Sequence, residues 1–291
     1  MSNENAGGRT ALVTGASTGI GAATALTLDA AGWTVFAGVR RAEDGAALRG
    51  RSTGRLQPVI LDVTDQATIA AARDTVAAAV GEAGLAGLVN NAGIAVAGPL
   101  EYLPLDDLRR QLEVNVVGLV AVTQAFLPLL RRARGRIVNV GSVSGLLAAP
   151  LTGAYCASKF AVEGLTDSLR RELRPFGLHV ALVQPGDIAT PIWERSATAG
   201  RALEAQLSAE ARERYGRAIA AAQAYVETVV RKASPAEEVA ATITAALTAA
   251  RPRTRYLVGK NAAVQAWLAR WTPDRTLDAL LEREIGLPRT A

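Results

Sequence analysis

Residues 10–21 read TALVTGASTGIG, a short apolar run that leads into a loop with three glycines. The apolar run is typical of a buried strand, and the alanine-rich segment after the loop has helical spacing. Gly15, Gly19 and Gly21 allow the backbone to turn sharply and to approach a pyrophosphate, whose charge the helix N-terminus would stabilise. Three residues separate the first two glycines, so the spacing differs from the common G-x-G-x-x-G fingerprint, and a plain tight turn is the alternative.

Strand-like runs and helix-like segments alternate along the rest of the chain. Runs rich in Val, Ile and Leu occupy residues 10–16, 34–40, 56–63, 85–93, 135–142, 179–186 and 255–259. Continuous apolar runs indicate a sheet buried on both faces, and alternation of strands with helices indicates parallel pairing. We therefore predict an α/β fold, a Rossmann-type doubly wound parallel sheet of about seven strands with helices on both faces.

The domain organisation follows from where this alternation holds. We predict a flexible tail over residues 1–8, a single domain over 9–260 and a helical extension over 261–291. Residues 187–233 are long, helical and polar, and they follow a strand end, where open α/β sheets bind their ligands. We expect this segment to be a lid over the substrate.

The extension carries apolar residues at helical spacing, first Val264, Trp267, Leu268 and Trp271, and then Leu277, Leu280, Leu281 and Ile285. Packing on the body of the protein or on another subunit is the favoured interpretation. A membrane-surface contact and a wall of an apolar substrate pocket are the alternatives.

Composition excludes several classes of function. The chain has 291 residues, of which 49% are hydrophobic and 20% charged, enough to bury a sizeable core. No apolar run approaches the about 18 residues that span a membrane, and the opening MSNENAGGRT lacks the apolar core of a secretion signal, so we expect a cytoplasmic protein without an integral membrane segment. One cysteine, Cys156, and one histidine, His179, leave little for a metal site. The net charge of +5 comes from scattered arginines with few aromatic residues, which argues against nucleic-acid binding.

The second predicted strand ends with Arg40 and Arg41. NAD-binding domains commonly have an acid there for the ribose 2′-hydroxyl, and an acid would repel a 2′-phosphate. Arginine can instead bind a phosphate with two parallel hydrogen bonds. NADP(H) is therefore favoured over NAD(H), and two solvated arginines are the alternative.

Polar residues also end the third and fourth predicted strands. Asp62 can accept a hydrogen bond from an adenine amino group, although an aspartate that caps the next helix is nearly as plausible. Asn90 can hold neighbouring strand ends together. Ala92 and Gly93 allow the backbone to come close to a ribose.

Residues 153–164, GAYCASKFAVEG, place Tyr155 four residues before Lys159, one of only three lysines among 32 basic residues. Residues four apart share a helix face. A nearby cation lowers the pKa of a phenol, which allows the tyrosine to donate or accept a proton near neutral pH. A compact ammonium group can also hold ribose hydroxyls. A solvated pair is the alternative.

Two further polar residues are candidates for the same site. Ser142 ends the fifth strand, from which its hydroxyl can reach the phenol and orient a carbonyl oxygen. A serine hydrolase would need a histidine base, and His179 lies at the start of the next strand, the wrong end for a site at strand C-termini. Asn115 interrupts an apolar helix face, and a bound water that links it to Lys159 would satisfy both groups.

Together, T-G-x-x-x-G-I-G, N-N-A-G, the helical Asn, the Ser, Y-x-x-x-K and PGDIAT resemble a classical short-chain dehydrogenase/reductase, collinearly from residue 10 to about residue 191. Residues 85–101 and 126–145 are similar to the branch that contains 17β-hydroxysteroid, retinol and hydroxybutyrate dehydrogenases. The resemblance implies an oxidoreductase that transfers a hydride between NADP(H) and a carbonyl or secondary alcohol of an apolar small-molecule substrate. An NAD-dependent alcohol dehydrogenase and a non-catalytic nucleotide sensor are the alternatives.

By this resemblance, Asn115, Ser142, Tyr155 and Lys159 form a catalytic tetrad. The residues expected to bind the cofactor are Gly15, Ser17, Thr18, Gly19, Ile20, Gly21, Arg40, Arg41, Asp62, Val63, Asn90, Ala92, Gly93, Tyr155, Lys159, Pro185, Gly186, Ile188 and Thr190. Thr18 departs from the pattern, because many NADP-preferring relatives have a basic residue there. Family members usually pair through the helices after strands four and five, which implies a homodimer or homotetramer.

Overall fold

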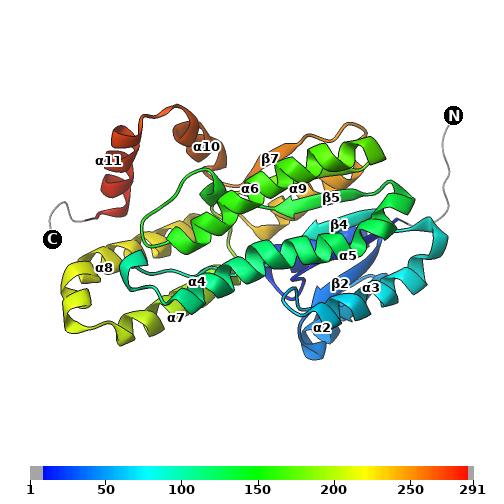
Figure 1. Cartoon of the computed structure of the whole chain (residues 1–291), viewed down its shortest axis with the longest axis horizontal. Helices are drawn as coiled ribbons and strands as arrows, with labels where there is room; N and C mark the ends of the chain where they lie inside the picture. Colours follow the sequence, from blue (N-terminus) through cyan, green and yellow to red (C-terminus); the bar gives the residue numbers. More distant parts are fainter. Residues whose placement is uncertain (1–8, 288–291) are drawn as a thin grey trace.

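A computed structural model describes residues 9–287 of the chain (Figure 1). The flexible tail predicted over residues 1–8 lies outside the described residues. Within them, seven parallel strands form one sheet in the order β3-β2-β1-β4-β5-β6-β7, which confirms the predicted fold class. The strands are β1 (Thr10–Val13), β2 (Thr34–Val39), β3 (Leu56–Ile60), β4 (Gly87–Asn90), β5 (Arg136–Val140), β6 (His179–Pro185) and β7 (Arg255–Val258). The order reverses between β1 and β4, so ligands are expected at the carboxyl ends of these strands.

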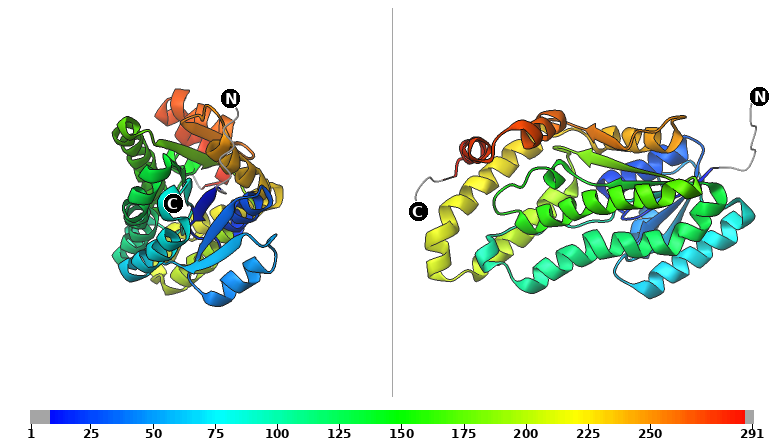
Figure 2. Two further views of the ribbon diagram at one scale, coloured as in Figure 1. Left: turned by 90° about the vertical axis from the view of Figure 1, so that its right-hand side faces the viewer. Right: turned by 45° about the horizontal axis from the view of Figure 1, so that its top comes forward.

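Helices cover both faces of the sheet, as the figures show (Figures 1 and 2). The α-helices of the described residues are α1 (Gly19–Ala30), α2 (Ala42–Arg49), α3 (Gln66–Val80), α4 (Leu105–Leu112), α5 (Gly118–Ala133), α6 (Gly153–Leu173), α7 (Pro191–Gln206), α8 (Ala209–Lys232), α9 (Ala236–Thr248), α10 (Ala262–Trp271) and α11 (Asp274–Ile285). Neighbouring strand residues project to opposite faces. Val13 accordingly packs with Leu28 of α1 and Ile243 of α9, whereas Leu12 packs with Phe126 of α5 on the other face.

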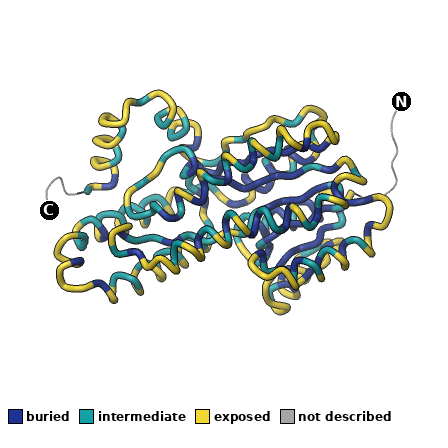
Figure 3. The backbone as a smooth tube through the Cα atoms, in the orientation of Figure 1, coloured by how far each residue is buried: buried dark blue, intermediate teal, exposed yellow. Residues whose placement is uncertain are grey.

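Four helices that follow β6 or β7 gather at one end of the molecule, beyond the sheet, whereas α9 packs on the sheet (Figures 1 and 2). Helices α7 and α8 lie within the predicted lid, residues 187–233, and α10 and α11 lie within the predicted extension. Helix α11 contacts α8, and α10 contacts β7. The five inner strands are almost entirely buried, whereas the edge strands β3 and β7 and these four helices keep exposed residues (Figure 3).

One helical stretch among the described residues, Leu105–Ala133, is long and apolar enough to cross a membrane by length and composition, with a mean hydropathy of 1.6 over an 18-residue window. It includes a π-helical turn at Glu113–Val117 between α4 and α5. In this fold Val122, Phe126 and Leu130 bury their side chains against the sheet. The absence of an integral membrane segment stays a prediction.

Candidate active site

A cavity of about 780 Å³ lies at the carboxyl ends of the central strands, between the glycine-rich loop, the lid and the extension. The predicted site residues that line it are Gly15, Ser17, Thr18, Gly19, Ile20, Arg40, Asp62, Val63, Ala92, Gly93, Ser142, Tyr155, Lys159, Pro185, Gly186, Ile188 and Thr190. Four other predicted residues do not line it, namely Gly21, Arg41, Asn90 and Asn115. Most of the predicted site thus comes together in one space.

The glycine-rich loop fits the pyrophosphate of a dinucleotide. Gly15 and Gly19 have positive φ angles of 62° and 56°, a conformation that L side chains rarely adopt. A β-carbon on Gly21 would collide with Gly15 O and would stand 2.5 Å from Asn91 Nδ2, so only glycine lets α1 approach the loop. The loop therefore presents bare backbone at a helix N-terminus, with no acidic residue in the first turn of α1.

Two residues that the sequence reasoning missed hold this loop in place. Thr14 Oγ1 accepts hydrogen bonds of 3.0 Å from the backbone N–H groups of Asn91 and Ala92. Asn91 Nδ2 donates to Thr14 O at 2.9 Å and to Gly15 O at 3.2 Å. The end of β4 is thereby joined to the loop after β1.

Asn90 differs from its predicted role in cofactor binding. Its buried Nδ2 donates hydrogen bonds of 2.9 Å to Thr123 Oγ1 on α5 and to Asn139 Oδ1 on β5. It therefore holds neighbouring strand ends together and points away from the cavity. Since consecutive strand residues project to opposite sides, the pair Asn90–Asn91 already carried the signal that only one of them could face the loop.

The two arginines after β2 have different environments. Arg40 lines the cavity. Arg41 forms two hydrogen bonds with Asp44, of 3.0 and 2.9 Å, and lies 3.6 Å from a carboxylate oxygen of Glu43. The acidic first turn of α2 thus draws Arg41 away from the cavity, which corrects the expectation that both arginines face the cofactor.

Asp62 both shapes a turn and faces the cavity. Its Oδ1 accepts hydrogen bonds from the backbone N–H and the hydroxyl of Thr64, at 2.9 and 2.8 Å. The next helix, α3, is capped by Asp65, whose Oδ1 accepts from the Ala67 N–H at 2.8 Å. The helix-capping alternative for Asp62 is therefore wrong.

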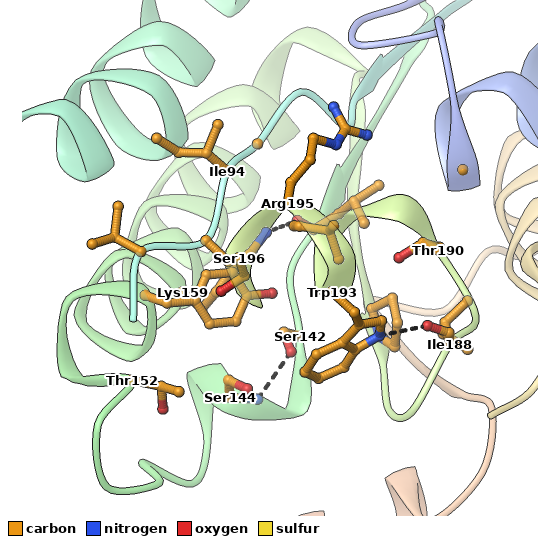
Figure 4. A pocket seen from close by; sticks show the side chains of 18 of the residues that line it. Ile94, Ser142, Ser144, Thr152, Lys159, Ile188, Thr190, Trp193, Arg195 and Ser196 are labelled. Atoms are coloured by element: carbon orange, nitrogen blue, oxygen red, sulfur yellow. Dashed lines mark hydrogen bonds between the residues drawn. The ribbon is translucent and has the colours of Figure 1, made fainter. Parts of the chain in front are cut away.

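Tyr155, Lys159 and Ser142 meet at the junction of β5 and α6. Lys159 is buried, and its Nζ donates a hydrogen bond of 2.9 Å to Val140 O while lying 5.7 Å from the centroid of the Tyr155 ring. Ser142 Oγ accepts a hydrogen bond of 3.1 Å from the Ser144 N–H, in a turn that packs on α6. Figure 4 shows Ser142 and Lys159 in one pocket with Trp193 of the lid, whose Nε1 donates to Ile188 O at 2.7 Å.

Desolvation dominates the pKa values of this pair. Tyr155 is half-buried by surface area, yet its hydroxyl lies among protein atoms, and burial raises its pKa to about 12 against the opposing effect of a hydrogen bond with Ser142. Burial lowers the pKa of Lys159 to about 8. The sequence predicts that the lysine lowers the tyrosine pKa toward neutrality. Burial raises the pKa of Tyr155 instead, and Nζ is directed at Val140 O, so the lowering of the tyrosine pKa by this lysine stays a prediction.

Asn115 is satisfied by the chain itself. Its Oδ1 accepts from the Ile94 N–H at 2.9 Å, and its Nδ2 donates to Ile94 O and to Ser158 Oγ, both at 3.0 Å. Gln111, one turn earlier, accepts from the Val96 N–H at 2.7 Å. Both side chains therefore hold the cavity-lining segment after β4. A water link from Asn115 to Lys159 is not needed to satisfy the amide, and a part in proton relay stays a prediction.

The far part of the cavity is formed by the lid and the extension, and it is mainly apolar, although Tyr225, Gln265 and Glu284 also line it. Its lining residues from these segments include Ala222, Val226 and Val229 of α8, Leu268 of α10, and Leu277, Leu280, Leu281 and Ile285 of α11. Of the four apolar residues at helical spacing on α10, only Leu268 lines the cavity. Val264, Trp267 and Trp271 are 60%, 59% and 65% exposed. The extension contacts β7 and α8, as the favoured interpretation predicted, and it also forms part of the pocket wall, which was one of the alternatives.

The sequence profile described as short chain dehydrogenase matches residues 9–200, which include the glycine-rich loop, Ser142, Tyr155 and Lys159. The chain belongs to the short-chain dehydrogenase family. This membership confirms the resemblance drawn from the motifs, and it makes the protein an oxidoreductase of that family. The profile ends inside the lid, so α8 to α11 lie outside the matched residues.

Similar proteins include members of this family that cover nearly the whole chain. Retinol dehydrogenase 5 of Mus musculus is 40% identical over 282 residues, which are 92% of this chain and 86% of the relative. An NADPH-dependent 3-dehydrocapnine reductase of Ornithobacterium rhinotracheale is 34% identical over 95% of this chain and 97% of the relative. The crystal structure of a short-chain dehydrogenase/reductase from Burkholderia phymatum in complex with NAD is 27% identical, with a TM-score of 0.75 over 98% of each chain. The chain therefore lies close to retinol dehydrogenases within the family.

Proposed function

We propose that this dehydrogenase transfers a hydride between NADP(H) and the carbonyl or secondary alcohol carbon of an apolar substrate. One observation carries the proposal: Tyr155, Lys159 and Ser142 line the same cavity as the glycine-rich loop, and apolar side chains of the lid and extension line its far part. A cofactor at the loop and an apolar substrate beyond it would meet at Tyr155.

The cofactor-binding residues follow from the cavity lining. The loop of Gly15 and Gly19 would hold the pyrophosphate, Arg40 a 2′-phosphate, Asp62 the adenine and Lys159 the nicotinamide ribose. When bound, the nicotinamide supplies or accepts the hydride. The chain contributes position and electrostatics.

Tyr155 is the proposed acid and base. Its raised pKa keeps the phenol protonated at neutral pH, which suits donation of a proton to the oxygen of a carbonyl during reduction. Lys159, whose pKa of about 8 leaves it mostly protonated at pH 7, would stabilise the phenolate that remains. In the reverse direction the phenolate would accept the alcohol proton.

Ser142 is suited to orient the substrate oxygen. Its Oγ already accepts a hydrogen bond from the Ser144 N–H, so the hydroxyl proton can be donated to that oxygen. The Ser142 hydroxyl lies beside the Tyr155 phenol, so both hydroxyl groups would polarise the same carbonyl.

The preference for NADP(H) is supported by Arg40 in the cavity and by the absence of an acid at the end of β2, whose sequence is TVFAGV. The similarity to an NADPH-dependent reductase also supports this preference for NADP(H). The alternative, an NAD-dependent alcohol dehydrogenase, is favoured by the engagement of Arg41 with Asp44, which leaves a single guanidinium at this position.

An apolar substrate is supported by the cavity lining and by the retinol dehydrogenase relatives. The test is an absorbance assay at the reduced-nicotinamide band, with NADPH and NADH, across retinoids, steroids, short hydroxy acids and simple carbonyls. We expect turnover of large apolar carbonyls with NADPH. Tight cofactor binding without turnover of any compound would favour the nucleotide sensor instead.

A homodimer or homotetramer is also proposed. Two large apolar residues on the helices after β4 and β5, Val117 and Phe160, are 48% and 46% exposed and suit a contact with a second copy. Light scattering during size-exclusion chromatography would measure the mass, and a monomer at micromolar concentration would refute this part.

A further inference from the structure

The lid helix α7 begins directly against the glycine-rich loop. A β-carbon on Gly19 would stand 3.3 Å from Thr190 Cβ and 3.5 Å from Pro191 Cδ. Thr190 is the N-cap residue of α7 and Pro191 its first helical residue. The first turn of the lid therefore contacts the loop that is suited to hold a pyrophosphate.

Arg195, one turn into α7, reaches across to the loop. Its Nη2 donates a hydrogen bond of 2.7 Å to Thr18 Oγ1, and its Nε donates to Pro191 O at 3.2 Å. The two residues are 177 positions apart in the sequence, and both line the main cavity. Figure 4 shows Arg195 among the residues that line the pocket.

Positive charge gathers at this contact, where Arg195 is exposed to solvent. Thr18 is the N-cap residue of α1, and a helix N-terminus carries partial positive charge. A guanidinium group beside it adds a second positive charge. Arg195 forms no ion pair with any acid between residues 9 and 287, and the first turn of α1 has no acidic residue. An anion bound between Arg195 and α1 would offset both charges.

We propose that Arg195 is a phosphate-binding residue carried by the lid. Its guanidinium exchanges the Thr18 hydroxyl for a phosphate oxygen of the dinucleotide, and this contact couples cofactor binding to closure of the lid. The proposal rests on the proposed function, because the anion is the cofactor. The pyrophosphate and the 2′-phosphate share the chemistry that a guanidinium recognises.

The helix offers a matched control. Arg201 also lies on α7, and its Nη2 donates to Thr198 Oγ1 at 3.1 Å. Arg201 does not line the cavity. Arg201→Gln therefore removes the same charge from the same helix without touching the proposed site.

The dissociation constants of NADPH and NADH, measured for the full chain by quenching of tryptophan fluorescence, test the proposal. Arg195→Gln is expected to weaken binding by about tenfold or more, whereas Arg201→Gln changes it by less than about twofold. Weaker binding of both cofactors in Arg195→Gln assigns Arg195 to the pyrophosphate. Weaker binding of NADPH alone assigns it to the 2′-phosphate. Unchanged constants for both cofactors would overturn the proposal. If the wild-type protein binds neither cofactor, the proposed function fails as well.

Hydrogen exchange of the α7 amides tests the coupling separately. At saturating NADPH, we expect slower exchange over residues 191–206 in the wild-type protein and in Arg201→Gln, but not in Arg195→Gln. Equal protection in all three proteins would show that the lid closes without this arginine.

Discussion

The Lys159 Nζ atom lies 5.7 Å from the centroid of the Tyr155 ring, and the two side chains lie on the same face of α6. The four-residue spacing places the amine beside the phenol ring, and the amine donates a hydrogen bond to Val140 O. Both groups lie among many protein atoms, although Tyr155 keeps part of its surface exposed. Burial consequently shifts both pKa values in the direction that favours the neutral form.

The lowered pKa of Lys159 predicts a particular pH dependence of stability. Its value of about 8 in the folded protein lies below the ordinary 10.5, so between these values the unfolded chain binds more protons. The free energy of unfolding should therefore rise with pH in this window, by on the order of 2 kcal/mol relative to Lys159→Met. Urea unfolding of both proteins between pH 8 and 10 measures the difference. Curves that run parallel would mean that the amine is not desolvated.

Arg40 and Arg41 are predicted to contribute differently to cofactor choice. Arg40→Ser removes the guanidinium that lines the cavity and should weaken NADPH binding by about tenfold, with little effect on NADH. Arg41→Ser breaks the contacts with Asp44 and should leave both dissociation constants within about twofold of the wild type. Titrations of each variant with each cofactor check this. Equal effects of the two substitutions would contradict the separation of roles.

The wall formed by α11 is predicted to act on the substrate alone. Leu281→Asn places an amide in the apolar part of the cavity and should raise KM for a large apolar carbonyl by about tenfold. The dissociation constant of NADPH should not change. Val264→Asn, at a position 60% exposed on the outer side of α10, is the control. An unchanged KM in Leu281→Asn would mean that the substrate does not reach the extension.

The sheet and the centre of the site could be predicted from the sequence because their signals are local. Apolar runs such as residues 135–142 end in polar or small residues, and parallel strands bring those ends to one edge. The four-residue spacing of Tyr155 and Lys159 likewise fixes a shared helix face without knowledge of the rest of the chain.

The features of the site that differ from the sequence-based predictions depend on spatial neighbours that the sequence does not reveal. Asn90 turns inward because Asn139 and Thr123, from other elements, accept its amide protons. The pKa of Tyr155 depends on how deeply its hydroxyl is enclosed, which spacing alone does not give. Arg195 meets Thr18 because α7 lies against the glycine-rich loop, a contact between residues 177 positions apart.

Tyr155→Phe tests the central claim most directly, with NADPH turnover and NADPH binding measured on the same protein. The substitution removes one hydroxyl at the meeting point of the loop and the apolar wall. We predict that turnover falls by about 10²–10⁴-fold while the dissociation constant of NADPH is retained. The control is Tyr215→Phe, because the Tyr215 hydroxyl donates to Glu101 outside the cavity. This variant should retain the turnover rate of the wild type. Wild-type turnover in Tyr155→Phe would contradict the assignment of this phenol as the acid and base.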